Sequence, residues 1–294
     1  MSFSQDVKAE LAATPPRMPC CRRALLFGLL YDSQAEGDKL TATYSDISTA
    51  ELCVNLIKFA YGRQADVSEL RRGAHKYLAI SFNSKNAVKK LELFIRTRDA
   101  SVIFECPECA SAFVRGVFMA TGSISAPSSA THLEMKHAHV ERVGNLFDIL
   151  CGLGLQPLTS KKDNDFRFYY KNRSAVQDFM SYIGGNQAVF EMVNYQLQKD
   201  LRNDENRATN CVTRNISRSI TASAKQIQTI RDIQTRGLIE AMPPKLRRTA
   251  ELRLANPEAT IEELAALHTP PISKSGANHR IEKIMAWCES HLQK

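Results

Sequence analysis

Residues 109–125 read CASAFVRGVFMATGSIS, and residues 21–37 read CRRALLFGLLYDSQAEG. In both stretches a Cys is followed by Ala after three positions and by Gly after seven. Large apolar residues stand between and after these positions at the spacing of a buried helix. The chain therefore contains the same helix twice, which indicates that a larger unit is duplicated.

The repeat extends beyond the two helices. Alternation of polar and apolar residues predicts strands, and apolar residues at a spacing of about 3.6 predict helices. In the first copy the predicted order is strand, helix, two strands and helix, at residues 39–46, 48–62, 65–71, 76–83 and 86–95. The second copy has the same order, at residues 131–139, 139–154, 156–163, 165–172 and 174–184.

These patterns predict an α+β domain over residues 1–187, with repeats at about 20–105 and 106–187 and pseudo-twofold symmetry. A short first helix, capped by Ser2 or Ser4, precedes the repeats. Gly28 and Gly116 stand in the middle of the repeated helices, where Gly costs about 1 kcal/mol relative to Ala. Close contact between two backbones would compensate, so we expect the helices to pack side by side. Glycines in loosely packed core helices are the alternative.

Paired helices that each begin an α/β half-domain resemble the LAGLIDADG homing endonucleases. In that family the last Asp of each motif holds the catalytic metal in the DNA groove. LFGLLYDSQ and VRGVFMATG place Ser33 and Thr121 at these positions, and neither offers the carboxylate that Mg²⁺ prefers. Asp32 is adjacent, but one residue along a helix turns a side chain by about 100°, and the other copy has Ala120 there. The resemblance thus implies a degenerate domain that does not cut DNA, with no catalytic residue. A residual nuclease is the alternative.

The chain of 294 residues has a net charge of +8, and the excess is concentrated in its last third. Residues 196–294 carry 16 basic and 11 acidic residues, whereas residues 1–195 carry 23 and 20. This excess suits a polyanionic partner, and a solvated basic surface is the alternative. No run approaches the roughly 18 apolar residues of a membrane span, and the start MSFSQDVKAEL lacks the pattern of a secretion signal. We therefore expect a cytoplasmic protein without membrane contact.

Residues 188–240 predict a helical linker, formed by a pair of helices. Apolar residues recur there every three or four positions, at Phe190, Val193, Leu197 and Leu201, and again at Ile227, Ile230 and Ile233. Between these runs lies RNDENRATNCVTRN, residues 202–215. Its Asn and Arg side chains either bind phosphates or bases or cap helix ends in a turn between two helices.

Residues 241–294 predict three helices. Pro243 and Pro244 begin the first, Thr260 and Glu263 form the capping box of a short second one, and Ser273 caps the third. Four apolar residues at helical spacing form the inner face of the third helix: Ala277, Ile281, Ile284 and Cys288. A capped short helix, a tight turn and a longer helix with a polar leading end describe a helix-turn-helix. A three-helix bundle that binds protein is the alternative.

In a helix-turn-helix the leading end of the second helix enters the major groove, where Asn pairs with adenine and Lys or Arg with guanine. The residues expected to contact DNA on this face are Ser273, Lys274, Ser275, Asn278, His279, Arg280 and Lys283. The residues expected to meet phosphates are Lys245, Arg247 and Arg248 on the first of the three helices, and Lys161 and Lys162 in the duplicated domain.

Five stretches resemble the WhiA family of bacterial DNA-binding regulators: MSFSQDVKAEL, VRGVFMATGSIS, RNDENRATNC, PPKLRRTAELRL and PPISKSGANHRI. They stand in the family's order and span most of the chain. The resemblance implies a degenerate LAGLIDADG domain joined to a helix-turn-helix similar to that of sigma factors. It also implies a transcription regulator, linked to sporulation, cell division and chromosome segregation and associated with the nucleoid.

Double-stranded DNA is the partner that this resemblance implies. The alternative function is that of a protein-recruiting adaptor, which contacts a sigma factor or another transcription or division protein through the duplicated domain. The sequence leaves the oligomeric state open.

The eight cysteines are expected to be reduced thiols. Cys106 and Cys109 form a C-x-x-C motif, and Cys20 and Cys21 stand at the matching place in the first repeat. If the two helices begin side by side, four thiols can converge on Zn²⁺. Adjacent cysteines are a poor chelating pair, however, and only Cys21 and Cys109 align between the copies. We therefore expect buried thiols packed as small apolar residues, and no metal.

The sequence shows no other pattern that binds a cofactor. The seven histidines lack the spacing of a metal site, and no glycine-rich phosphate loop is present. No cofactor is therefore expected.

Overall fold

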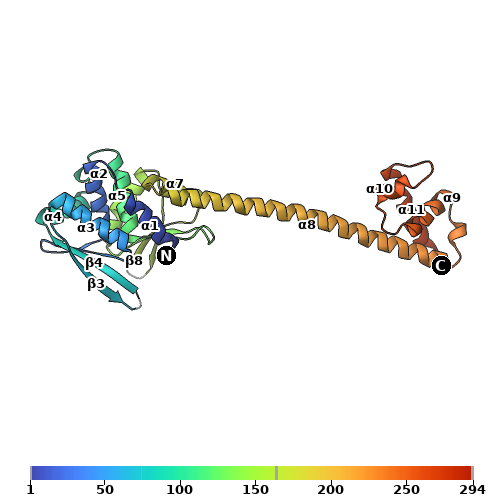
Figure 1. Cartoon of the computed structure of the whole chain (residues 1–294), viewed down its shortest axis with the longest axis horizontal. Helices are drawn as coiled ribbons and strands as arrows, with labels where there is room; N and C mark the ends of the chain where they lie inside the picture. The colour runs from blue at the N-terminus through green and yellow to red at the C-terminus, as the bar shows by residue number, and fades with distance from the viewer. Residues whose placement is uncertain (1, 74, 163–164, 293–294) are drawn as a thin grey trace. The chain divides into compact units, whose positions relative to one another are not determined.

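The computed structural model describes residues 2–73, 75–162 and 165–292. The chain forms two compact units, Met1–Lys199 and Asp200–Lys294, which we call the amino-terminal unit and the carboxy-terminal unit. In Figure 1 the first is drawn mainly in blue and green and the second in orange and red. One helix, α8 (Asn186–Thr235), has residues in both units.

The helices α2 (Pro19–Leu29) and α5 (Glu108–Thr121) pack directly against each other at the centre of the amino-terminal unit. A Cβ atom on Gly28 would lie 2.1 Å from the backbone oxygen of Phe113, and one on Gly116 would lie 2.3 Å from that of Leu25. Neither position has space for a side chain. The prediction from the two glycines is confirmed, because the helices touch through their backbones.

Each repeat forms an antiparallel sheet of four strands in the same order, β1-β2-β4-β3 and β5-β6-β8-β7. The strands of the first sheet are β1 (Gln34–Glu36), β2 (Lys39–Tyr44), β3 (Asp66–Arg72) and β4 (His75–Asn83). Those of the second are β5 (Gly122–Ile124), β6 (Leu133–His137), β7 (Leu158–Lys162) and β8 (Asp165–Tyr170). The equal order confirms the duplication. The sequence patterns missed β1 and β5, because three residues are too few to show alternation.

The remaining helices of this unit cover one side of the sheets, as Figure 1 shows. They are α1 (Phe3–Ala13), α3 (Ile47–Tyr61), α4 (Lys85–Thr97), α6 (Val140–Gly152) and α7 (Arg173–Ile183), with the short 3-10 helix η1 (Ala100–Val102). Ser2, one of the two expected caps, begins α1 in a capping box with Gln5. Along β2 the buried residues are Leu40, Ala42 and Tyr44, so the alternate residues form an open face.

The helix α8 is a single helix of 50 residues, so the prediction of a helix pair was wrong. No Gly or Pro occurs between Gly185 and Gly237, and nothing in the backbone interrupts the helix. Residues 202–215 lie inside α8 and cannot cap helix ends in a turn. None of the helices in the described ranges combines the length with the apolar character that a membrane span requires.

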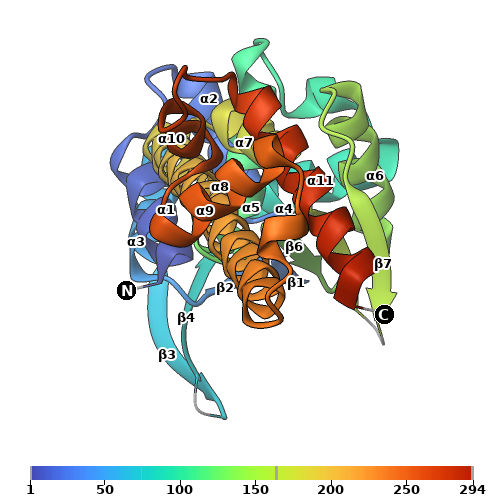
Figure 2. The same cartoon turned by 90° about the vertical axis from the view of Figure 1, so that its right-hand side faces the viewer.

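The carboxy-terminal unit gathers three helices around the last turns of α8 (Figure 2). They are α9 (Pro244–Ala255), α10 (Ile261–Ala266) and α11 (Lys274–Leu292), preceded by the 3-10 helix η2 (Ile239–Ala241). Ile230 and Ile233 of α8 join their core. The capping box of Thr260 and Glu263 is confirmed. All four residues predicted for the inner face of α11 are buried.

Candidate nucleic-acid interface

The leading turns of α11 present a polar face to solvent. Ser273 precedes the helix, and its Oγ accepts a hydrogen bond from the amide of Gly276 at 3.1 Å, which confirms the predicted cap. Among the other residues expected to contact DNA, Arg280 is half-buried. The remaining five are exposed: Lys274, Ser275, Asn278, His279 and Lys283. The buried inner face fixes the direction of this polar face, because both belong to one rigid helix.

Two glutamates accompany the polar face of α11. Glu262 of α10 accepts a hydrogen bond from the ammonium group of Lys274 at 3.2 Å, and Glu282 accepts one from the side-chain amide of Asn278 at 2.8 Å. The side chains of Lys274 and Glu262 are 68% and 75% exposed, and such exposed pairs contribute only about 0–1 kcal/mol. Breaking the contact between Lys274 and Glu262 therefore costs little free energy.

Two arginines, Arg248 of α9 and Arg280 of α11, lie near the turn between α10 and α11. His268 is buried there, and its Nε2 lies 3.2 Å from the hydroxyl oxygen of Thr249. Burial lowers the pKa of His268, and the nearby charges of Arg280 and Arg248 lower it further. Two arginines at one corner raise the local potential, so this corner is suited to a phosphate group.

The three residues of α9 that were expected to meet phosphates differ in their surroundings. Lys245 and Arg248 are exposed, and Arg248 lies 3.9 Å from Glu251. Arg247 is half-buried and forms ion pairs with Glu240 and Glu251. Lys245 and Arg248 are therefore better placed than Arg247 to reach a DNA backbone.

A second basic face lies on α8. Arg207, Arg214 and Arg218 recur at helical spacing, with Asn210 and Asn215 between them, and together they line a shallow hollow. All five are exposed. Positions three, four or seven apart lie on one side of a helix. Because α8 is continuous here, these five side chains form one polar stripe along it. Sequence reasoning missed Arg218, although continuing the helical spacing past residue 215 would have found it.

At the carboxyl ends of α2 and α5 the amino-terminal unit has a hollow of about 190 Å³. Asp32, Ser33 and Ala120 line it together with residues of β2. The side chain of Ser33 is buried, and the hydroxyl of Thr121 donates to the carbonyl of Val117 at 2.9 Å within its own helix. Among the described residues that line this hollow, only Asp32 is acidic.

A buried guanidinium group lies beside Ser33. Nη1 of Arg142, on α6, donates to the carbonyl oxygens of Tyr31 and Ser33 at 2.5 and 2.8 Å, and Arg142 is 7% exposed. The hydroxyl of Tyr31 donates to the carbonyl of Arg142 at 2.7 Å. On the other side, Nδ1 of His137 lies 3.8 Å from Oδ1 of Asp32. A fixed positive charge at this place opposes the binding of a divalent cation.

The strand β7, at the edge of the second sheet, carries the two lysines that were expected to meet phosphates. Nζ of Lys161 lies 5.2 Å from the centre of the Phe166 ring, and the side chain is exposed at the sheet edge. The side chain of Lys162 lies outside the described part of the structure.

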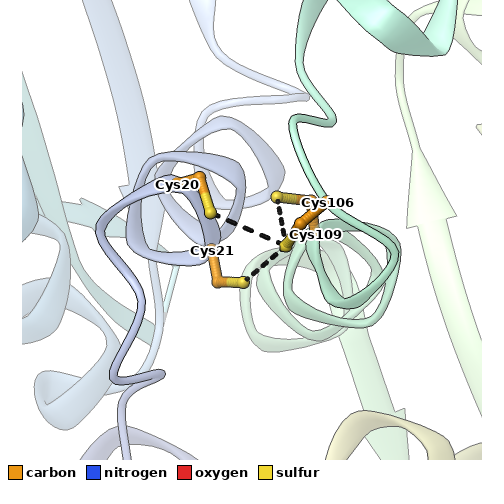
Figure 3. Close-up of side chains that lie close together, drawn as sticks. All are labelled: Cys20, Cys21, Cys106 and Cys109. Carbon is orange, nitrogen blue, oxygen red and sulfur yellow. Dashed lines mark hydrogen bonds between the residues drawn. The ribbon is translucent and has the colours of Figure 1, made fainter.

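The four cysteines at the beginnings of α2 and α5 lie together (Figure 3). In the sequence alignment of the two repeats, only Cys21 and Cys109 stand at equivalent positions. In the structure, however, all four sulfur atoms lie within 4.8 Å of one another. A hydrogen bond with Glu108 and burial raise the pKa of Cys106 to about 11. Burial and a hydrogen bond with Cys106 raise the pKa of Cys21 well above its usual range.

The chain matches the WhiA LAGLIDADG-like domain over residues 110–202 and the WhiA C-terminal HTH domain over residues 206–287. It is 31% identical to the probable cell division protein WhiA of Heliobacterium modesticaldum, over 99% of this chain and 97% of that protein. It is also 31% identical to the probable cell division protein WhiA of Alkaliphilus metalliredigens, over 97% and 96%. The chain belongs to the WhiA family.

Solved WhiA structures have the same fold. Full-length WhiA from Thermotoga maritima matches with a TM-score of 0.62 at 21% identity, over 99% of both chains. The amino-terminal LAGLIDADG domain of WhiA matches with a TM-score of 0.50 at 19% identity, over 62% of this chain and 92% of that one. The predicted fold class, a duplicated LAGLIDADG-like α/β domain with an all-α helix-turn-helix domain, is thereby confirmed, as is the resemblance to WhiA.

Proposed function

We propose that this WhiA-family protein binds double-stranded DNA in a sequence-specific manner through α11 and regulates transcription. The leading end of α11 supports this most directly. Lys274 and Asn278 are exposed one turn apart there, on a helix whose opposite face is buried in the core. Asn pairs bidentately with adenine, and Lys donates to guanine, so these two side chains suit the edges of neighbouring bases.

Basic residues around α11 supply the part of the affinity that does not depend on sequence. Lys245 and Arg248 on α9, and the arginine stripe of α8, are exposed and suit phosphate oxygens. Each phosphate contact releases counterions, so the binding of duplex DNA should weaken steeply as salt rises.

The role in the cell is proposed from the family. The two relatives above are named probable cell division proteins, and we extend a role in cell division to this chain. Chromosome segregation and the control of sporulation are the finer roles that the resemblance implies. Such a regulator acts in the cytoplasm, on the nucleoid.

The protein binds DNA without cutting it. Ser33 and Thr121 supply no carboxylate for a divalent cation, and Arg142 places a buried positive charge beside Ser33. Supercoiled plasmid incubated with Mg²⁺ or Mn²⁺ should therefore remain intact. Nicking that disappears in Asp32→Ala would instead support the residual endonuclease.

The test of the DNA-reading helix is the double substitution Lys274→Ala with Asn278→Ala. Each good base contact contributes about 1–3 kcal/mol of discrimination, so affinity for a preferred site should fall by about tenfold to several hundredfold. The inner face of α11 is untouched, so the fold survives. Lys161→Ala, on the edge of the second sheet, should weaken binding less and equally for all sequences.

The DNA affinities of the double variant and of Lys161→Ala are compared by fluorescence anisotropy at one salt concentration. The duplexes are a site selected from genomic fragments and a scrambled control. If Lys161→Ala costs more affinity and base preference survives the double substitution, the duplicated domain reads the DNA and α11 does not.

Exposed apolar side chains favour a second function, the recruitment of a protein. Phe190, Leu197 and Leu201 of α8 are all exposed. A sigma factor or another transcription or division protein is the partner that we propose for this adaptor. Capture from parental cells should yield this partner with the wild-type chain and lose it with Leu197→Ser plus Leu201→Ser. Equal recovery with both chains would place the contact elsewhere.

A further inference from the structure

The beginnings of α2 and α5 form a cluster of four thiols, which we call the cysteine cluster: Cys20, Cys21, Cys106 and Cys109. Each repeat contributes two of them. The sulfur of Cys106 lies 3.6 Å from that of Cys20 and 3.5 Å from those of Cys21 and Cys109. Figure 3 shows the four side chains directed toward one another across the space between the two helices.

The contact between the repeats explains why the thiols meet. Gly28 and Gly116 hold the backbones of α2 and α5 in contact. Cys21 and Cys109 each stand seven residues before these glycines, which is about two helical turns. Related positions of two helices that cross on a pseudo-dyad face each other. Cys20 and Cys106 flank this pair, and their sulfur atoms complete the group.

We propose that the cysteine cluster binds one Zn²⁺ ion through four thiolates. Zinc bonds thiolate sulfur at about 2.3 Å in tetrahedral geometry, which separates the ligands from one another by about 3.8 Å. The sulfur–sulfur contacts of 3.5–3.6 Å, and the limit of 4.8 Å over all pairs, bracket this value. A centre that the four sulfur atoms surround therefore has the size that zinc requires.

The surroundings of the cysteine cluster favour a bound dication. Two cysteines are buried and two are partly buried, so four thiolates there need a compensating charge. The first-turn amides of a helix lack partners within the helix and carry partial positive charge. Two helices begin at this cluster, and their amides favour thiolate sulfur.

Other chemistry fits the cysteine cluster less well. A disulfide would bring one sulfur pair to about 2 Å and leave the other two thiols without a role, whereas Cys106 contacts all three neighbours at nearly equal distances. An iron–sulfur cluster spreads its cysteines over several metal atoms and needs a wider separation of the sulfurs. Between single ions in the same thiolate site, Zn²⁺ binds more tightly than Fe²⁺.

The proposed zinc is structural. Four protein ligands leave no open position for water or substrate. The 11 residues of α2 extend about 16 Å, and the cysteine cluster lies at the opposite end of that helix from Ser33. The ion therefore fastens the first turns of the two repeats to each other, at a distance from the polar hollow.

The experiment is metal analysis of the full chain, purified without a metal-binding tag. Elemental analysis should find about one zinc per chain in the wild type. Cys106→Ser and Cys109→Ser should reduce this to near zero, whereas Cys211→Ser, at an exposed position of α8, should retain it. Zinc that persists in Cys106→Ser, or that is lost in Cys211→Ser, would overturn the proposal.

A measurement on the wild type alone covers the case in which a cysteine variant fails to fold. The protein is stripped of metal under reducing conditions and titrated with Co²⁺. Binding should produce intense visible bands of tetrahedral cobalt and a sulfur-to-cobalt charge-transfer band, both lost on adding Zn²⁺. A reduced wild-type protein without zinc and without these bands, or a mass showing a disulfide among the four cysteines, would overturn the proposal.

Discussion

At the scale of one residue, the contact between the repeats depends on two absent side chains. The backbone oxygens of Phe113 and Leu25 occupy the space that Cβ atoms of Gly28 and Gly116 would need. The cost of a helical glycine, about 1 kcal/mol, is offset by packing that only glycine allows. The sequence predicted this contact because the glycines recur at the same place in both copies. One copy alone would not distinguish a contact from a loosely packed core.

Gly116→Ala should destabilise the amino-terminal unit by about 1–3 kcal/mol or more, because its new Cβ overlaps backbone that cannot move aside cheaply. Gly152→Ala is the matched control, since a Cβ there meets nothing within 4 Å. Urea unfolding followed by circular dichroism measures both variants. Equal midpoints for Gly116→Ala and wild type would contradict the close contact.

Glu262 is expected to weaken DNA binding. It engages Lys274 and places a negative charge beside the face of α11. Glu262→Gln should tighten DNA binding by about two- to fivefold, the size of one exposed charge interaction. Glu289→Gln, toward the other end of α11 and also exposed, should change affinity little. Anisotropy titrations at one salt concentration compare the two, and weaker binding by Glu262→Gln would show that Glu262 supports the interface.

Arg142 and the cysteine cluster show what sequence patterns leave undetermined. Arg142 binds backbone carbonyls 109 and 111 positions away. A basic residue in an amphipathic helix is most often solvated, and nothing near Arg142 in the sequence distinguishes it. The cysteines were recognised as a possible group. Only the helix crossing determines where adjacent thiols point, and the sequence does not supply its geometry.

At the scale of elements, local signals decided which helices were predictable. The capping residues and the four buried positions of α11 agree, so its ends and its inner face were both predicted. For α8 the polar run at residues 202–215 predicts a break that the structure does not have. Composition is a weak guide there, because a polar helix without Gly or Pro can continue. The duplicated strands were recognised because each copy supports the other.

The turn between α10 and α11 should make the carboxy-terminal unit sensitive to acid. The pKa of buried His268 lies below its ordinary value of 6.5 in the folded state, so the unfolded chain binds the proton first as pH falls. The contribution of neutral His268 to the stability of the folded state is complete above pH 6.5. It is lost progressively as the pH falls toward the lower pKa that His268 has in the folded state.

Thermal unfolding between pH 7.5 and 5 measures this dependence. His268→Gln keeps a polar group near Thr249 but does not titrate, so its stability should vary less over the same range. A wild type whose stability is constant, or a variant with the same slope as wild type, would exclude His268 as the source.

At the scale of the whole molecule, the described residues form two separate hydrophobic cores. One lies between the sheets and helices of the amino-terminal unit, and the other joins α9, α10 and α11 to the last turns of α8. Residues 197–222 of α8 are all exposed. Most helical stability in proteins comes from tertiary packing, and this segment contributes to neither core. We therefore expect this part of α8 to transmit little stability between the two cores.

The two cores should therefore unfold in separate transitions. Ile183→Ala and Ile284→Ala remove the same atoms from buried sites in the first and second core, respectively. Each should cost about 2–5 kcal/mol. Each substitution should lower the midpoint temperature of its own unit only. The shift should be larger for the smaller carboxy-terminal unit, because a smaller unfolding entropy gives a larger shift in midpoint temperature. Scanning calorimetry of the full chain resolves the two transitions. A single transition shifted by either variant would show that the long helix couples the units, and that the stability of the helix-turn-helix domain cannot be considered apart from the duplicated domain.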